Sequence, residues 1–258
     1  LYPENARSEE FLTQYASVFN SVEGNSTFYA VPSEDTLAGW RARTPDGFRF
    51  CFKFPRAISH HKRLVDARQE TEQFLGRLES IRDRLGPLFL QLPPAFGPDS
   101  LPRLDEYLSA LPEAFCYAVE VRHPAFFYTA AGNDLIGLLR NRDASRVILD
   151  GRSVAEPDEW EGAAPIRLEE MEMGSEPFVR YIGRTDPEES NPFLEEWAVA
   201  IARWVSEGRT PYVFLHTGDD LYAPHLARQF HEHVSTRSAV GEMPDWPGES
   251  AGSQLRFL

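Results

Sequence analysis

Ionisable side chains end several short apolar runs of this sequence, and their types are those that transfer protons. Glu23, Lys53, Glu120 and Asp150 each close such a run. Burial raises the pKa of a carboxyl group and a nearby cation lowers it, so neighbouring carboxylates can divide into an acid and a base. A lysine whose pKa is lowered can act as a nucleophile. We therefore predict Glu120 as a base, Lys53 as an acid or a nucleophilic amine for Schiff-base chemistry, and the other two as carboxylates that set protonation states.

A second set of polar residues lies at or near the ends of the same runs, and we predict that it binds substrate. These residues are Asn25, Gln91, Arg122, His123, Arg180 and His216. The guanidinium fork of arginine matches a carboxylate or a phosphate, so the predicted ligand is a small anionic molecule. Glycine-rich nucleotide-binding fingerprints are absent from the sequence, and we predict no organic cofactor. A Glu-x-Arg pair such as Glu120 and Arg122 also has a purely structural interpretation, as an ion pair.

The apolar runs recur at a spacing that fits alternating strands and helices. They begin at residues 19, 48, 88, 117, 147, 178 and 212. A strand with its crossover helix takes roughly 30 residues or more, and buried parallel strands read as continuous apolar runs. In such folds the carboxyl ends of the strands meet at one rim, where ligands bind. The spacing therefore predicts that the polar residues meet in one site.

The segments between the runs read as helices and loops. Ser33 is predicted to cap one helix, and Asn191, followed by Pro192, is predicted to begin another that ends before Gly208. Two long polar segments, residues 55–68 and 151–176, are predicted to be loops at the ligand-binding rim. Long loops in this position often act as lids.

Several motifs occur in the order typical of one known family. They lie at residues 2–3, 19–29, 44–55, 86–94, 117–124 and 246–249, and include Gln91-Leu92-Pro93-Pro94 and Glu120-Val121-Arg122-His123-Pro124. The chain resembles the YecE-like domain-of-unknown-function family. The resemblance implies a TIM-type (β/α)8 barrel formed as a single domain by residues 1–258, with its first strand before residue 1. The chain departs from the family pattern at Ile182, where the family has His, and at His216-Thr217, where it has paired Asn.

Composition limits the classes of function. The net charge of −14 disfavours nonspecific binding to nucleic acids or anionic membranes, and no apolar segment approaches the ~18 residues of a membrane span. The two cysteines, Cys51 and Cys116, are predicted to be reduced and buried, which favours a cytoplasmic protein. The chain has 24 Arg and only two Lys, so a lysine at a strand end is a specific feature. The sequence gives no preference for an oligomeric state.

Other functions remain open on the sequence alone. A metal-dependent phosphoesterase or isomerase could use the carboxylates with His123 and His216, although Lys53 and Arg122 would repel a divalent cation there. A non-catalytic protein that binds a small ligand or a partner is a second alternative. A minor third is nucleic-acid binding through the basic loop of residues 56–63. In that loop, His60 and His61 are candidate contacts to an anion.

Overall fold

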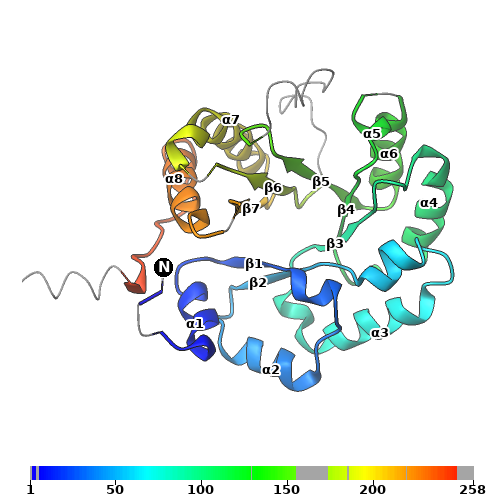
Figure 1. Cartoon of the computed structure of the whole chain (residues 1–258), viewed down its shortest axis with the longest axis horizontal. Coiled ribbons are helices and arrows are strands. Elements are labelled where there is room, and N and C mark those ends of the chain that lie inside the picture. The colour runs from blue at the N-terminus through cyan, green and yellow to red at the C-terminus, as the bar shows by residue number, and fades with distance from the viewer. Residues whose placement is uncertain are drawn as a thin grey trace, which may run out of the picture.

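Parallel strands and helices alternate along the chain (Figure 1). The computed structural model describes residues 2–3, 6–128, 130–154, 174–184, 186–218 and 220–248. Its strands are β1 (Ser21–Gly24), β2 (Arg49–Phe52), β3 (Leu88–Gln91), β4 (Tyr117–Glu120), β5 (Ala144–Asp150), β6 (Phe178–Ile182) and β7 (Tyr212–His216). Each of the seven predicted apolar runs overlaps one of these strands, so the spacing predicted the strand positions correctly.

The strands form two sheets, and the prediction of a complete eight-stranded TIM-type barrel is wrong. β1 and β2 pair in a two-stranded parallel sheet, and β3 to β7 pair in sequence order in a five-stranded parallel sheet. The described residues contain no eighth strand. Between β2 and β3 the ladder is reduced to two isolated bridges, Phe50 with Leu85 and Lys53 with Phe89. Pro87, just before β3, has no N–H to donate, which is one reason why this ladder stays incomplete.

Helices follow most of the strands and cover the outer faces of the sheets (Figure 1). They are α1 (Phe11–Ala16), α2 (Glu34–Ala42), α3 (Arg68–Leu78), α4 (Leu101–Ser109), α5 (Ala125–Tyr128), α6 (Ala130–Asn141), α7 (Pro187–Ser206) and α8 (Ala223–Ser235). Ser33 caps α2 as predicted, because its Oγ accepts a hydrogen bond from the backbone N of Thr36 at 3.1 Å.

Helix α7 begins earlier than the predicted Asn191. The side chain of Asp186 accepts a hydrogen bond from the backbone N of Glu188 at 3.0 Å, so this upstream aspartate is the cap. Asn191 instead bonds through its Oδ1 to His233 in α8, at 2.5 Å. Two possible caps lie five residues apart here, and the sequence pattern favoured the wrong one.

The two predicted loops differ in what the structure describes. Residues 55–68 contain a π-helix, Ala57–His61, in which Ile58 and Ser59 are buried. Single π-helical turns are often found at functional sites. The second predicted loop, residues 151–176, lies mostly outside the described residues.

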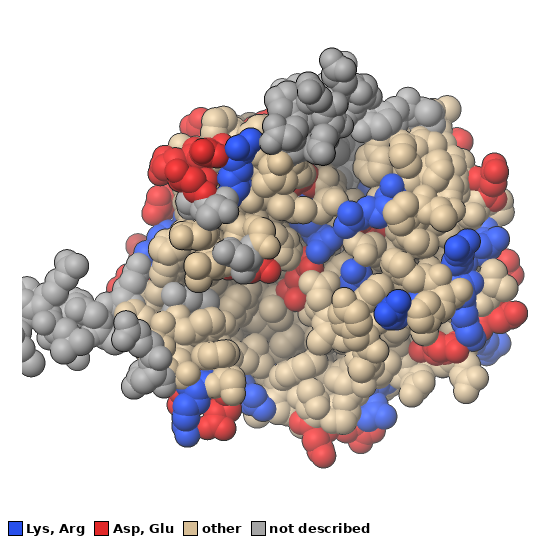
Figure 2. All heavy atoms as spheres, in the orientation of Figure 1, with Lys and Arg blue, Asp and Glu red and all other residues tan. Residues whose placement is uncertain are grey.

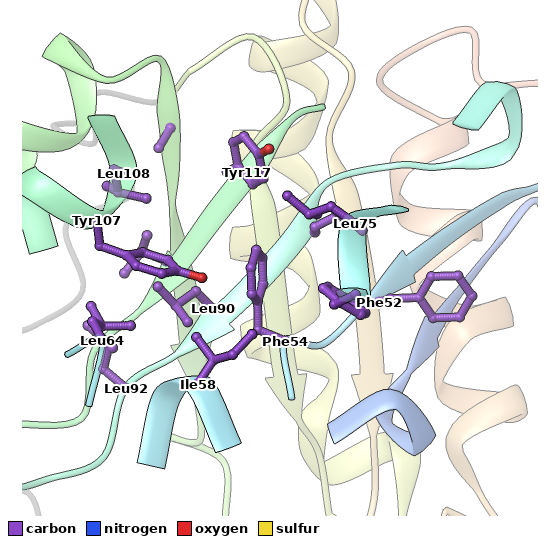
Figure 3. Close-up of a cluster of buried hydrophobic side chains, with 14 of the residues drawn as sticks. Phe52, Phe54, Ile58, Leu64, Leu75, Leu90, Leu92, Tyr107, Leu108 and Tyr117 are labelled. Carbon is purple, nitrogen blue, oxygen red and sulfur yellow. The ribbon is translucent and has the colours of Figure 1, made fainter. Parts of the chain in front are cut away.

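A large apolar cluster fills the space between the strands and the outer helices α3 and α4. Phe54 lies at its centre in Figure 3, with its ring 5.2 Å from that of Phe74 and 6.5 Å from that of Tyr107. Leu75 comes from α3 and Tyr107 from α4, and both pack toward the strands. This cluster fixes the helices to the outer face of the strands.

A second apolar cluster, here called the inner layer, occupies the opposite face of the strands. It consists of Cys51, Phe89, Ala118, Val147, Phe178, Tyr212 and Phe214, which come from β2 to β7. The ring of Phe178 lies 5.2 Å from that of Phe89 and 5.0 Å from that of Phe214. Strands from both sheets therefore share one apolar interior.

Two sequence-based expectations concern the burial of the cysteine thiols and the absence of a membrane-spanning segment. Cys51 is buried in the inner layer, but Cys116 is exposed, so the prediction that both thiols are buried is wrong for Cys116. It lies just before β4, where the chain is still entering the sheet. Among the described residues, none of the helices is both long enough and apolar enough to span a lipid bilayer.

Candidate functional site

The strands deliver polar side chains directly above the inner layer. Lys53, Gln91, Glu120, Arg180 and His216 each lie two positions after a residue of that layer, so they share its face. Glu23 joins them because it is paired in register with Cys51. These six residues, together with Asn25 and Arg122, are called the polar cluster below. The structure brings these eight side chains together at the carboxyl ends of the strands.

Arg180 links two buried carboxylates that come from opposite parts of the sequence. Its Nε donates to Glu23 Oε2 at 2.7 Å and its Nη2 to Glu23 Oε1 at 2.8 Å. Its Nη1 donates to Glu120 Oε2 at 2.9 Å. The side chain of Glu23 is 4% exposed and that of Glu120 is 1% exposed. Buried carboxylates need such partners, because an unpaired charge in the interior is strongly unfavourable.

Glu120 is held by donors on both of its carboxylate oxygens. Besides Arg180, Gln91 donates through Nε2 to Oε1 at 2.7 Å, and the Nε of Arg122 also donates to Oε1. Three donors hold this carboxylate in place and occupy lone pairs with which it would accept a proton. This environment favours Glu120 as an orienting group over the predicted role as a base.

Lys53 is the more buried of the two lysines. Its Nζ donates to Gln91 Oε1 at 2.8 Å and lies 4.2 Å from the centre of the Phe28 ring. The residue is 9% exposed, and its backbone is fixed by a 2.6 Å hydrogen bond from Thr27 Oγ1 to its carbonyl oxygen. Burial lowers the pKa of Lys53, and the positive charge of Arg180 lowers it further. The lysine is therefore closer to losing its proton than an ordinary lysine.

His216 lies on the other side of Glu23 from Lys53, because β1 lies between β2 and β7. Its Nε2 is 3.5 Å from Glu23 Oε2 and its Nδ1 is 3.5 Å from Asp220 Oδ1. These are distances of an ion pair rather than of a good hydrogen bond. Burial opposes the charged form of His216, but the carboxylate of Glu23 outweighs it and raises the histidine pKa. The imidazole can therefore carry a proton near neutral pH.

The charge state of Glu23 makes folding dependent on pH. Burial would raise the pKa of this carboxyl, but His216 and Arg180 lower it to about 2, below its usual value of 4.5. A lowered folded pKa stabilises the protein above the unfolded pKa, and this contribution is lost as the pH falls toward the folded pKa. We expect the wild type to exceed Glu23→Gln in free energy of unfolding at pH 6, and the difference to shrink between about pH 4.5 and pH 2. Urea unfolding at several pH values measures it, and a difference that stays constant with pH would contradict the expectation.

Asp150 does not belong to the polar cluster, which corrects its predicted catalytic placement. In the pairing of β5 with β6, Leu149 aligns with Arg180, while Asp150 aligns with Tyr181. Leu149 therefore shares the face of the polar cluster, and Asp150 points to the helices. Its fully buried carboxylate accepts hydrogen bonds from Trp197 Nε1 at 2.7 Å and from Arg152 Nη2 at 2.9 Å. The sequence predicted where the strand ends, but it did not predict the face of the sheet to which the side chain of the last residue points.

His123 and Asn25 lie at the edge of the site. The Nδ1 of His123 accepts a hydrogen bond from the backbone N of Ala125 at 3.2 Å, and its ring packs 6.1 Å from that of Phe126. His123 thus caps the turn after β4, and among the described residues neither its hydrogen bond nor its ring contact involves the polar cluster. Asn25 is exposed, and its Nδ2 donates to Glu23 Oε1 at 2.6 Å.

Phe28 contacts Lys53 and was not predicted as a site residue, whereas His60, which contacts Phe28, was predicted only as a candidate contact to an anion. Phe28, in the 3-10 helix Asn25–Phe28, presents its ring face to the lysine. His60, in the π-helix, packs edge-on against the same ring at 5.0 Å, and its Nδ1 lies 2.9 Å from Ser59 Oγ. His60 lies in the basic loop singled out from the sequence, but nothing in the sequence indicated its contact with Phe28.

Charges of both signs gather in this region. Near the middle of the face in Figure 2, acidic and basic atoms lie side by side where the surface is hollowed. Within the described part of the chain, no three His, Cys, Asp or Glu side chains are grouped so that they could hold a metal ion. The two carboxylates of the cluster are instead bonded to arginines.

Comparisons with known proteins agree with the resemblance drawn from the sequence. The family model described as "Protein of unknown function DUF72" matches residues 1–250. UPF0759 protein YecE of Escherichia coli (strain K12) is 38% identical over 250 residues, which cover 93% of this chain and 92% of that protein.

Solved structures show the same fold. A DUF72 family protein from Thermotoga maritima MSB8 superposes with a TM-score of 0.69 at 25% identity, covering 91% of this chain and 92% of the other. One from Enterococcus faecalis V583 gives a TM-score of 0.68 at 20% identity, covering 87% and 93%. The match of the family model to nearly the whole chain and the identity to YecE show that this chain belongs to the DUF72 family.

Proposed function

We propose that the polar cluster binds a small anionic molecule and catalyses an acid–base reaction on it without an organic cofactor. The observation that carries the proposal is the charge balance of the cluster. Lys53, Arg122 and Arg180 supply three positive charges, and Glu23 and Glu120 supply two negative ones, which leaves one positive charge (3 − 2). A protonated His216 adds a second. An anion would neutralise this excess in a half-buried, poorly screened position.

Arg122 is the cation of the cluster best placed to receive a ligand. Its side chain is 36% exposed, compared with 12% for that of Arg180, so it is open to the solvent. The bond from its Nε to Glu120 fixes the direction of the guanidinium. A pre-oriented guanidinium favours binding, because less side-chain freedom is lost when the ligand arrives.

Lys53 and His216 are the groups best suited to proton transfer. They lie on either side of Glu23, one with a lowered and the other with a raised pKa, so the two values move toward each other and toward neutrality. Glu23 and Glu120, each fixed by arginine, orient and polarise these groups. In this proposal Glu120 is an orienting carboxylate, in place of the base predicted from the sequence.

Binding of simple anions tests the proposal. We expect isothermal titration of the wild type with inorganic phosphate or malonate to give saturable binding. We expect Lys53→Met to weaken this binding by about tenfold or more, because a hydrogen bond to a charged group contributes about 1.5–3 kcal/mol. Lys62→Met is the matched control, since Lys62 is the only other lysine of the chain and is bonded to Glu70 at 2.8 Å.

The outcomes of this titration are distinct. Weaker binding by Lys53→Met together with unchanged binding by Lys62→Met supports the proposal. The absence of saturable binding of both anions by the wild type would overturn it. Equal affinities of the wild type and Lys53→Met would also overturn the assignment of the site. The chain has a net charge of −14, so nonspecific attraction of anions is a poor alternative explanation.

A further inference from the structure

We infer that Lys53 forms an imine with the carbonyl group of its substrate, which makes the substrate class small aldehydes or ketones that carry an anionic group. This inference rests on the proposed function and adds a covalent step to it. It depends on the surroundings of Nζ, on the contrast with Lys62, and on the position of Arg122.

The surroundings of the Lys53 amine make loss of its proton easier than for a lysine in water, because burial and the charge of Arg180 lower its pKa. Among the described residues, no carboxylate oxygen lies within 4.0 Å of its Nζ, so Glu120 and Glu23 act on the amine only at longer range. The partner of Nζ is a neutral amide oxygen at 2.8 Å. The Phe28 ring, 4.2 Å away, supplies some attraction to a cation but far less than a carboxylate would at this depth.

Lys62 shows what an ordinary lysine of this chain looks like. Its Nζ lies 2.7 Å from Glu70 Oε1 and donates to the carbonyl oxygen of Asp66 at 2.7 Å. Its side chain is 36% exposed, whereas Lys53 is 9% exposed as a residue. The chain therefore contains one solvated, ion-paired lysine and one buried lysine without a carboxylate partner. The reactivity of the Lys53 amine can therefore be compared with that of the Lys62 amine in the same protein molecule.

The covalent step uses groups that are in place. The neutral amine of Lys53 attacks the carbonyl carbon, a C–N bond forms, and the electron pair of the C=O π bond moves to oxygen, which takes up a proton. The nitrogen then loses a proton, and the C–O bond breaks with loss of water as the C=N bond forms, so one amine and one carbonyl give one imine and one water. A further proton on nitrogen gives the iminium ion, an electron sink for the adjacent carbon.

Neighbouring residues supply the remaining requirements of this step. Arg122, the most exposed arginine of the cluster, would hold the anionic group of the substrate. His60 packs on the same Phe28 ring at 5.0 Å, and burial and the charge of Lys53 lower its pKa. A neutral imidazole can accept the proton that the nitrogen releases.

Trapping with a reductant tests the imine. The probe is glyoxylate, a small anionic aldehyde, added to the full chain at pH 7 with sodium cyanoborohydride and followed by peptide mapping. We expect the carboxymethyl adduct to form on Lys53 at least about tenfold faster than on Lys62, because a charge-assisted contact from Arg122 to the carboxylate of glyoxylate raises its occupancy beside Lys53 by about that factor. Glycolaldehyde, which is neutral, should label Lys53 more slowly than glyoxylate, and phosphate should slow the labelling by glyoxylate.

Each result bears on the inference. Preferential adduct formation on Lys53, lost in Lys53→Arg and retained in Lys62→Arg, supports it. Equal labelling of the two lysines in the wild type overturns it, and this comparison requires no variant to fold. If labelling is equal while the wild type still binds phosphate, the imine fails and the proposed function stands. If phosphate binding is also absent, both fail.

Discussion

Replacement of Arg180 by methionine should lower the free energy of unfolding by about 3–5 kcal/mol at pH 7, since breaking a buried ion pair leaves uncompensated charge in the interior. The arginine serves two carboxylates at once, Glu23 and Glu120, with three hydrogen bonds of 2.7 to 2.9 Å. Both carboxylates are nearly inaccessible to water, which could otherwise replace the guanidinium. Urea denaturation of the wild type and the variant measures the difference.

A second property distinguishes this loss from a simple packing defect. Without Arg180, burial would favour the protonated form of Glu23. Lowering the pH should therefore remove part of the free-energy cost of the unpaired carboxylate in the variant. The gap between the wild type and Arg180→Met should therefore narrow as the pH falls from 6 to 4. Arg68→Met is the control, because Arg68 pairs with Glu72 on the exposed face of α3 and its loss should change stability little. An Arg180→Met protein as stable as this control would contradict our description of the site.

Replacement of Asp150 by alanine should also lower the free energy of unfolding by about 3–5 kcal/mol, while leaving the proposed anion site intact. The change removes the hydrogen-bond acceptor of Trp197 Nε1. It also leaves Arg152, whose side chain is 17% exposed, without its buried carboxylate partner. Arg152 would keep a partial partner in Glu196, 3.0 Å from its Nη1. Thermal or urea unfolding measures the stability, and titration with phosphate measures the site in the folded protein.

Asp105→Ala provides the matched control for Asp150→Ala. Asp105 also accepts two hydrogen bonds from an arginine, Arg142, at 2.7 and 2.8 Å, but this pair lies on the surface. We expect its loss to be small, because water replaces the partner of an exposed charge. A loss of phosphate binding in folded Asp150→Ala would show that Asp150 serves the site after all. Equal stability of the two variants would show that burial does not matter here.

The sequence predicted where the strands end because buried parallel strands are continuous apolar runs, and a run ends visibly. It could not predict the face of every final residue. The polar cluster was found correctly where the strand register places Glu120 and Arg180 above the inner layer. The same reasoning failed for Asp150, because β5 runs one residue further and its inward position at this level is Leu149. A displacement of one residue reverses the face of a strand, and no local pattern marked it.

The apolar pattern of the sequence also could not predict contacts between segments that are distant in the chain. Phe28 reads as an ordinary aromatic residue of a turn, yet its ring covers Lys53. The number of strands was inferred from a repeat of about 30 residues and from family resemblance, which indicate repeated β–α units. Neither source indicates where a backbone ladder is interrupted, as it is between β2 and β3. That interruption depends on the local geometry around Pro87 and on how the short strands twist.

The bonds of Arg180 have a mechanical consequence for the molecule. β1 lies against β7, but among the described strands no backbone ladder joins the two-stranded sheet to that edge of the five-stranded sheet. The guanidinium on β6 reaches across this seam to Glu23 on β1. An anion that competes with Glu23 for the guanidinium would therefore also loosen a joint between the sheets. Anion binding at Arg180 would then make the interior less rigid. Faster amide hydrogen exchange in β1 when the anion is bound would show this coupling.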